Sequence, residues 1–195
     1  MQEEIEAKIR IADPEGFRRR LAEAGAAGGE TVLETNHIFD SADGRLRRSG
    51  AAIRVREERA AAGGGRALRT VLTYKGPRQP GRFKRRPEVQ TPVADGAAIL
   101  AILHALGFAE TFLFEKRRTA WRLCKCEVVL DELPHIGWFA EVEGPTEDAV
   151  HEVLSDLGLA GEPVIAETYM RLLADDLAAR GRDPTRAKFS GDSHA

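Results

Sequence analysis

The first strand-like segment of this 195-residue chain alternates strictly between charged and apolar side chains. From Glu4 to Ile11 the sequence reads Glu-Ile-Glu-Ala-Lys-Ile-Arg-Ile. A period of two places successive side chains on opposite faces of a β-strand. Residues 4–11 are therefore predicted to form a strand with one apolar face and one face that carries both acids and bases.

The same alternation recurs in later segments, where acids and bases again share a face. A charged face on one strand usually points to water, but here apolar residues such as Ile5, Val55 and Val142 lie opposite the charges. If these apolar residues pack outward against helices, the charges point inward, where burial is costly unless they are paired or neutralised by a bound ion. The inward set would comprise six acids, Glu4, Glu6, Glu88, Asp131, Glu141 and Glu143, and six bases, Lys8, Arg54, Arg56, Lys75, Arg86 and Arg118.

Turn and cap signals divide the rest of the chain into short elements. Further strands are predicted at residues 32–39, 51–56, 68–75, 82–91, 111–123, 126–133 and 137–143. Helices are predicted at residues 14–25, 97–106, 147–158 and 167–180, the first of them capped by Asp13 and the second by Asp95. Residues 41–44 are predicted to form a turn and residues 60–65 a hairpin loop. About eight strands in hairpin succession indicate an α+β domain built on an antiparallel β-barrel or a strongly curved sheet, with flanking helices.

Residues 1–174 are predicted to form this one domain. Residues 175–195 would contain the end of the last helix and then a polar tail without apolar periodicity, which is expected to be disordered. Cys124 and Cys126 lie two apart in a predicted strand, where side chains share a face but are too far apart for an easy disulfide. They are expected to be reduced, as in a cytoplasmic protein.

The overall charge excludes some classes of partner. The net charge is −2, from 29 Lys and Arg against 31 Asp and Glu, which gives no general basic surface for nucleic acid or for an acidic membrane. The chain begins without the features of a signal peptide, and no apolar run reaches the roughly 18 residues of a membrane span. A cytoplasmic protein without a nucleic-acid or membrane partner is expected.

Mixed carboxylates and cations suit one kind of ligand. Mg²⁺ prefers carboxylate oxygens and bridges them to phosphates, and arginine binds phosphate in bidentate fashion. Two divalent cations balance the charge of a triphosphate, which is roughly four negative charges. The histidines are scattered over different predicted elements, so no zinc site is indicated.

In their order along the chain, these residues resemble the CYTH superfamily of triphosphate tunnel metalloenzymes, which includes class IV adenylate cyclases, thiamine triphosphatases and inorganic triphosphatases. The signature Glu-x-Glu-x-Lys stands here as Glu4-Ile5-Glu6-Ala7-Lys8. The resemblance spans residues 3–173, and its companion motifs are residues 36–40, 53–56, 73–77, 116–121, 130–131 and 137–144.

The resemblance implies an eight-stranded antiparallel tunnel and assigns a role to each charged residue. Implied ligands of Mg²⁺ or Mn²⁺ are Glu4, Glu6, Glu88, Asp131, Glu141 and Glu143. Implied triphosphate-binding residues are Lys8, Arg54, Arg56, Lys75, Arg86, Lys116 and Arg118. Implied catalytic residues are Glu4, Glu6, Lys8 and Asp131. The chain departs from the family pattern at Gln90, where an acid is frequent, and at Glu167, where many members have lysine.

Three functions remain open from the sequence. A metal-dependent phosphohydrolase acting on a small-molecule triphosphate, whether inorganic tripolyphosphate, a nucleoside triphosphate or thiamine triphosphate, is placed first because it needs no base pocket and no adenine-reading motif is visible. A class IV adenylate cyclase that makes cyclic AMP and pyrophosphate from ATP is the first alternative. A non-catalytic polyphosphate- or nucleotide-binding module is the second. A homodimer is compatible with the barrel exterior.

Overall fold

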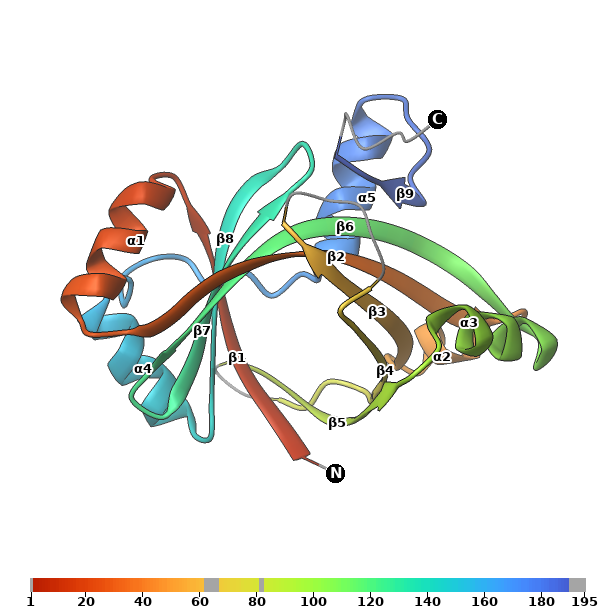
Figure 1. Ribbon diagram of the computed structural model, residues 1–195, viewed down its shortest axis with the longest axis horizontal. Helices are drawn as coiled ribbons and strands as arrows, with labels where there is room; N and C mark the ends of the chain where they lie inside the picture. Colours follow the sequence, from red (N-terminus) through yellow and green to blue (C-terminus); the bar gives the residue numbers. More distant parts are fainter. Residues whose placement is uncertain (1, 62–66, 81–82, 190–195) are drawn as a thin grey trace.

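The computed structural model describes residues 2–61, 67–80 and 83–189, with residues 2–4 described by their backbone alone. Within these residues, eight antiparallel strands form a closed barrel with helices around it (Figure 1). The barrel strands are β1 (Gln2–Ile11), β2 (Ala27–Ser41), β3 (Ala52–Ala60), β4 (Arg69–Lys75), β5 (Lys84–Val93), β6 (Phe108–Leu123), β7 (Cys126–Leu133) and β8 (Gly137–Gly144).

Strand order confirms the predicted antiparallel barrel. The sheet runs β2-β3-β4-β5-β1-β8-β7-β6, and β6 pairs back onto β2 to close it. The closing pair is the longest in the barrel, since β2 and β6 are paired from Ala27–Arg122 to Ser41–Phe108. Among the described residues every barrel strand pairs with two neighbours, so none is an edge strand along its whole length, and closure directs alternate side chains of every strand into the lumen.

Five helices lie outside the strands in the described part of the chain. They are α1 (Pro14–Glu23), α2 (Arg45–Arg48), α3 (Gly96–Ala105), α4 (Glu147–Asp156) and α5 (Tyr169–Ala179). The predicted cap residues are confirmed for α1 and α3, because Asp13 accepts from the Gly16 amide and Asp95 from the Ala98 amide. The short α2 follows the predicted turn and was not expected; Gly44 precedes it with a left-handed φ of 70°.

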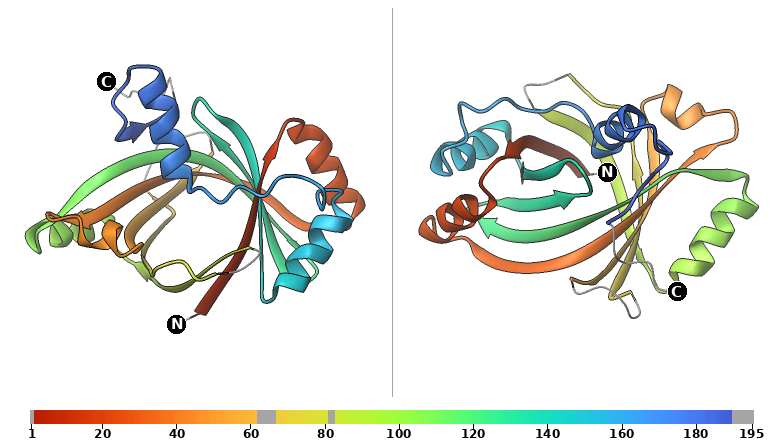
Figure 2. Two further views of the ribbon diagram at one scale, coloured as in Figure 1. Left: turned by 180° about the vertical axis from the view of Figure 1, so that it is seen from behind. Right: turned by 90° about the horizontal axis from the view of Figure 1, so that it is seen from above.

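The apolar strand faces pack outward, as the alternation predicted. Ile9, Val128 and Val142 belong to one buried cluster together with Phe17 of α1 and Val153 of α4. A smaller cluster joins β2 and β3 to α3 on another side. The three views place α1 and α4 together at one end of the molecule and α3 at the other (Figures 1 and 2). Tyr74 on β4 is an exception to the outward packing, because it is 40% exposed.

Helix α5 instead packs against inward-facing side chains. Phe139 shares a face of β8 with Glu141, and Phe114 shares a face of β6 with Lys116, because each pair is two residues apart. Both aromatic rings belong to the buried cluster that contains Leu173 of α5. The lumen is therefore apolar where α5 closes it and charged beyond.

We expect Leu173→Ala to lower the free energy of unfolding by about 2–5 kcal/mol, because Leu173 is fully buried and the truncation leaves a cavity. Urea denaturation measures this change. Leu106→Ala, at a side chain that is 69% exposed, should cost less than about 0.5 kcal/mol. Equal losses in the two variants would contradict the assigned packing of α5.

Two expectations need correction. Arg186–Ala187 forms a short strand, β9, that pairs in parallel with Leu113 and Phe114, so the expected disorder does not hold for this part of the tail. The pairing is available because β7 pairs with β6 only from Arg117 onward. Residues 190–195 lie outside the described chain.

Cys124 is exposed in the turn before β7, with a φ of 54°, so it shares no strand face with the buried Cys126. Both cysteines are free thiols.

Candidate functional site

A cavity of about 220 Å³ lies inside the barrel, and all eight barrel strands and α5 contribute to its wall. Eight cationic side chains and five carboxylates line it, an excess of three positive charges among the described residues. The cationic residues are Lys8, Arg54, Arg56, Lys75, Lys84, Arg86, Lys116 and Arg118; the acids are Glu6, Glu88, Glu127, Glu141 and Glu143. Such a lining favours an anionic ligand.

Most of the predicted site residues come together in this cavity. Of the predicted site residues whose side chains the structure describes, the lining contains all except Asp131. The side chain of Glu4 lies outside the described part, although its backbone pairs with Arg86 in the barrel. Three further residues that were not predicted from the sequence also line the cavity: Lys84, Glu127 and Tyr169.

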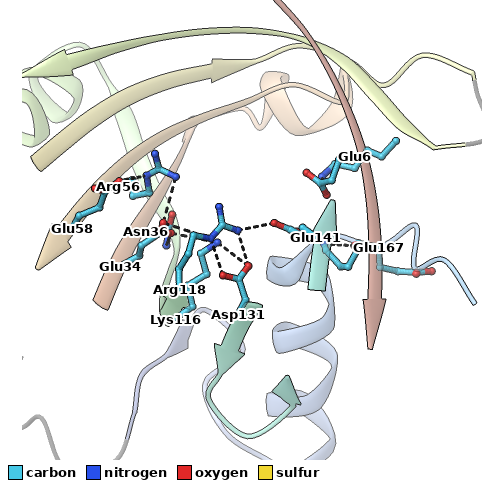
Figure 3. A network of polar contacts seen from close by, with 12 residues as sticks. Glu6, Glu34, Asn36, Arg56, Glu58, Lys116, Arg118, Asp131, Glu141 and Glu167 are labelled. Carbon is cyan, nitrogen blue, oxygen red and sulfur yellow. Dashed lines mark hydrogen bonds and ion pairs between the residues drawn. The ribbon is translucent and has the colours of Figure 1, made fainter. Parts of the chain in front are cut away.

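Asp131 lies behind the cavity wall and is fully buried. Its carboxylate accepts hydrogen bonds from Arg118 Nε at 2.7 Å, from Arg118 Nη2 at 2.6 Å and from Lys116 Nζ at 3.1 Å. Figure 3 shows the two cations converging on it. A bidentate arginine contact of this kind fixes the guanidinium plane, so Asp131 orients Arg118 toward the lumen.

Glu34, which was not predicted from the sequence, is a second buried acid among the cations (Figure 3). It is 1% exposed, and its carboxylate lies 3.3 Å from Lys116 Nζ and 3.4 Å from Arg56 Nη1. Burial alone would raise the pKa of Glu34, but Lys116, Arg118 and Arg56 outweigh burial and hold the pKa well below its ordinary 4.5. Glu34 therefore stays ionised and partly neutralises the cationic wall.

This depressed pKa predicts loss of stability in acid. A carboxylate whose pKa is lower in the folded state stabilises the fold fully above the unfolded-state value, here about 4.5, and loses that contribution as pH falls below it. We expect the urea concentration at the midpoint of unfolding to decrease as the pH is lowered below 4.5. The decrease should be smaller in Glu34→Gln than in the wild type. Glu23→Gln, at an exposed position on α1, should follow the wild-type curve. A Glu34→Gln curve parallel to the wild type would contradict this assignment.

Arg54 is the cation best placed to receive a ligand. It makes no ion pair with any residue in the described ranges, and its Nε atom is buried without a hydrogen-bond partner there. Burial, and then repulsion from neighbouring Arg56, lower the pKa of its guanidinium. A bound anion would supply the missing hydrogen-bond acceptors and offset both costs.

Lys8 and Glu141 face each other across β1 and β8. Their charged atoms lie 3.4 Å apart, and Glu141 also accepts from Arg118 Nη2 at 2.6 Å. Burial is the largest influence on the pKa of both groups, and it lowers the pKa of Lys8. Burial would raise the pKa of Glu141, but the cations Lys8 and Arg118 outweigh burial and lower that pKa. Lys8 Nζ also donates to the Glu167 carbonyl at 3.1 Å, while the Glu167 side chain is exposed.

A row of carboxylates crosses three neighbouring strands. The register places Glu6 of β1 opposite Glu143 of β8, and Glu143 opposite Glu127 of β7. Like charges placed directly opposite each other destabilise a sheet. Glu6 is partly compensated by Lys84, whose Nζ lies 2.7 Å from its carboxylate. A divalent cation bound at this row would relieve the repulsion.

The donor chemistry of this row fits Mg²⁺ or Mn²⁺, which prefer oxygen ligands. No three Asp, Glu, His or Cys side chains of the described residues are already arranged as a metal-ligand cluster. This does not disqualify the row, because Mg²⁺ typically keeps several waters and takes only one or two protein carboxylates together with substrate phosphates. Glu6 and Glu143 are the pair that could hold such an ion.

Relatives in sequence are named as adenylate cyclases. A candidate adenylate cyclase of Methanocaldococcus jannaschii is 24% identical over 178 residues, covering 87% of this chain and 97% of that protein. Adenylate cyclase CyaB of Aeromonas hydrophila is 28% identical over 187 residues, covering 89% of this chain and 90% of that protein.

None of the helices among the described residues is long and apolar enough to span a membrane.

Solved structures share the fold. A candidate adenylate cyclase from Vibrio parahaemolyticus superposes with a TM-score of 0.75 at 18% identity, covering 89% of this chain and 98% of that one. The candidate adenylyl cyclase HpAC1 from Hippeastrum gives a TM-score of 0.65 at 19% identity, covering 92% of this chain and 97% of that one. That protein is described as having a dominant triphosphatase activity. The CYTH domain model matches residues 2–169, which include all eight barrel strands and end at the first residue of α5, and the chain therefore belongs to the CYTH family.

Proposed function

We propose that this protein is a divalent-metal-dependent phosphohydrolase that cleaves a triphosphate bound in the barrel cavity. The observation that carries the proposal is the excess of three positive charges on the cavity wall, with Arg54 lacking an ion-pair partner in the described chain. A ligand with several closely spaced negative charges compensates such a wall, and a triphosphate is a ligand of this kind.

Each part of the wall has a separate task in this proposal. Arg54, Arg56 and Arg86 bind phosphate oxygens, and Lys75 adds a further positive charge. Arg118, oriented by Asp131, and Lys8 stabilise charge that develops on the cleaved phosphoryl group. Asp131 thus acts through Arg118. We propose it as a positioning residue and not as a metal ligand, because both its carboxylate oxygens already accept hydrogen bonds from Lys116 and Arg118.

Glu6 and Glu143 would hold Mg²⁺ or Mn²⁺, with Glu4 and Glu141 nearby on the same two strands. When bound, the ion supplies charge neutralisation and polarises a phosphoryl oxygen or water. The carboxylates themselves fix the ion at one side of the cavity, opposite the arginines of β3. Cytoplasmic location and homodimer formation stay predictions of the sequence.

Adenylate cyclase activity is the second candidate, and the names of the two sequence relatives favour it. In that reaction the ribose 3′-hydroxyl of ATP attacks the α-phosphorus and pyrophosphate leaves. The triphosphatase activity described for HpAC1 favours hydrolysis instead. The same cations would serve either reaction, since the two differ in where the substrate chain lies along the cavity.

Product analysis separates these candidates. The purified protein is incubated with tripolyphosphate, ATP or thiamine triphosphate, with Mg²⁺, with Mn²⁺ or with EDTA. We expect metal-dependent release of orthophosphate from at least one substrate. Cyclic AMP and pyrophosphate from ATP would instead establish the cyclase, and tight binding without any turnover would establish the non-catalytic module.

A further inference from the structure

Tyr169, the first residue of α5, joins the C-terminal helix to the cavity. Its side chain is 6% exposed and lines the cavity together with its neighbours Thr168 and Met170. The ring packs edge-on against Phe139 of β8, with the ring centroids 5.4 Å apart. The orientation of this side chain is therefore fixed from behind by the apolar end of the barrel.

The Tyr169 hydroxyl has no hydrogen-bond partner among the residues that the structure describes. Its oxygen is buried and makes no hydrogen bond with any residue in the described ranges. A buried phenol normally finds a partner, because an unmet hydrogen bond is costly. Burial, followed by the carboxylates of Asp131 and Glu141, raises the pKa of Tyr169 well above its ordinary value, so the hydroxyl keeps its proton and can donate.

The Tyr169 ring holds a cation of the cavity wall. Lys8 Nζ lies 3.8 Å from the ring centroid, and Lys116 Nζ lies at 5.4 Å. A desolvated ammonium group over a tyrosine face is attracted by the ring quadrupole. Because Lys8 Nζ also donates to the Glu167 carbonyl two residues earlier, the start of α5 contacts Lys8 through both ring and backbone.

We propose that Tyr169 is a ligand-contacting residue of the cavity: its hydroxyl donates a hydrogen bond to an anionic phosphoryl oxygen, and its ring positions Lys8 for the same group. The proposal rests on the proposed function, since it names a contact within the same site. It also explains why a residue outside the barrel strands forms part of the charged wall. The positive end of the α5 helix dipole, which begins at Tyr169, favours the same anion.

Two variants separate the hydroxyl from the ring. Tyr169→Phe keeps the ring over Lys8 but removes the donor, and Tyr169→Leu removes both. Isothermal titration calorimetry with tripolyphosphate should show about tenfold weaker binding, or more, for Tyr169→Phe, because a hydrogen bond to a charged group is lost. Tyr169→Leu should bind more weakly still. Tyr74→Phe, on the outer face of β4, is the matched control and should bind as the wild type does.

The chain has only two tyrosines, Tyr74 and Tyr169, which permits a direct readout. Protein labelled with ¹³C at the tyrosine Cζ atoms gives two signals, assigned with the two phenylalanine variants. Tripolyphosphate should shift the Tyr169 signal and leave that of Tyr74, which is 40% exposed, unchanged. A Tyr169 signal that stays unmoved at saturation, or a Tyr169→Phe variant with wild-type affinity, would overturn the inference while leaving the proposed function intact. Absence of tripolyphosphate binding by the wild type would overturn both.

Discussion

Replacing Arg54 by alanine is expected to weaken tripolyphosphate binding by about 100-fold. Hydrogen bonds to charged groups contribute about 1.5–3 kcal/mol each, and 1.4 kcal/mol corresponds to a factor of ten. Arg54 can make two such bonds to one phosphate, and no described acid competes for it through an ion pair. Calorimetry without a metal ion measures this loss separately from turnover.

The same strand offers the control for this experiment. Arg59 also lies on β3, but on the opposite face. Its Nη2 lies 2.6 Å from Glu57 Oε2, and its Nη1 donates to Thr35 Oγ1 at 3.4 Å. Arg59→Ala removes the same charge from the protein without changing the cavity, so its affinity should stay within a factor of about two of the wild type, apart from weak screened long-range effects. If both variants lost affinity equally, net charge rather than the cavity would be responsible for binding.

The period of two was sufficient to find most of the cavity wall. Arg54 and Arg56, or Glu141 and Glu143, are assigned to the lumen by alternation alone once the apolar face is known to pack on helices. Lys84 obeys the same rule, since it shares a face of β5 with Arg86 and Glu88 and could have been found from the sequence. Glu34 could have been found in the same way, two residues before Asn36 on β2.

Other features depend on register and tertiary contacts that alternation does not encode. Whether Asp131 meets a metal or an arginine depends on the pairing of β7 with β6, which sets Asp131 directly opposite Arg118. Tyr169 reaches the cavity because α5 packs into the end of the barrel, and nothing in the period of a helix specifies where its first residue lies. The pairing of β9 likewise depends on the part of β6 that β7 leaves uncovered, which composition of the tail does not reveal.

Glu6→Gln is expected to lower metal-dependent turnover by about 100-fold or more while sparing anion binding. Glu6 is 5% exposed and lies opposite Glu143, so an amide there removes one of two carboxylates that could hold the ion and reduces the local negative charge. Removal of that negative charge also releases Lys84, which now contacts Glu6 at 2.7 Å, for a phosphate oxygen. Affinity for tripolyphosphate in EDTA should therefore be unchanged or higher.

Glu6 is informative because turnover should fall while affinity for the anion does not. A variant that was merely misfolded would lose both turnover and binding, whereas loss of an ion ligand lowers turnover alone and raises the Mg²⁺ or Mn²⁺ concentration at half-maximal rate. Glu132→Gln is the matched control, because Glu132 pairs with Arg117 at 3.1 Å on the outer face of β7. Full metal-dependent activity in Glu6→Gln would exclude the carboxylate row as the ion site and would leave Glu88 on β5 and Glu141, two residues before Glu143 on β8, as the remaining lining carboxylates.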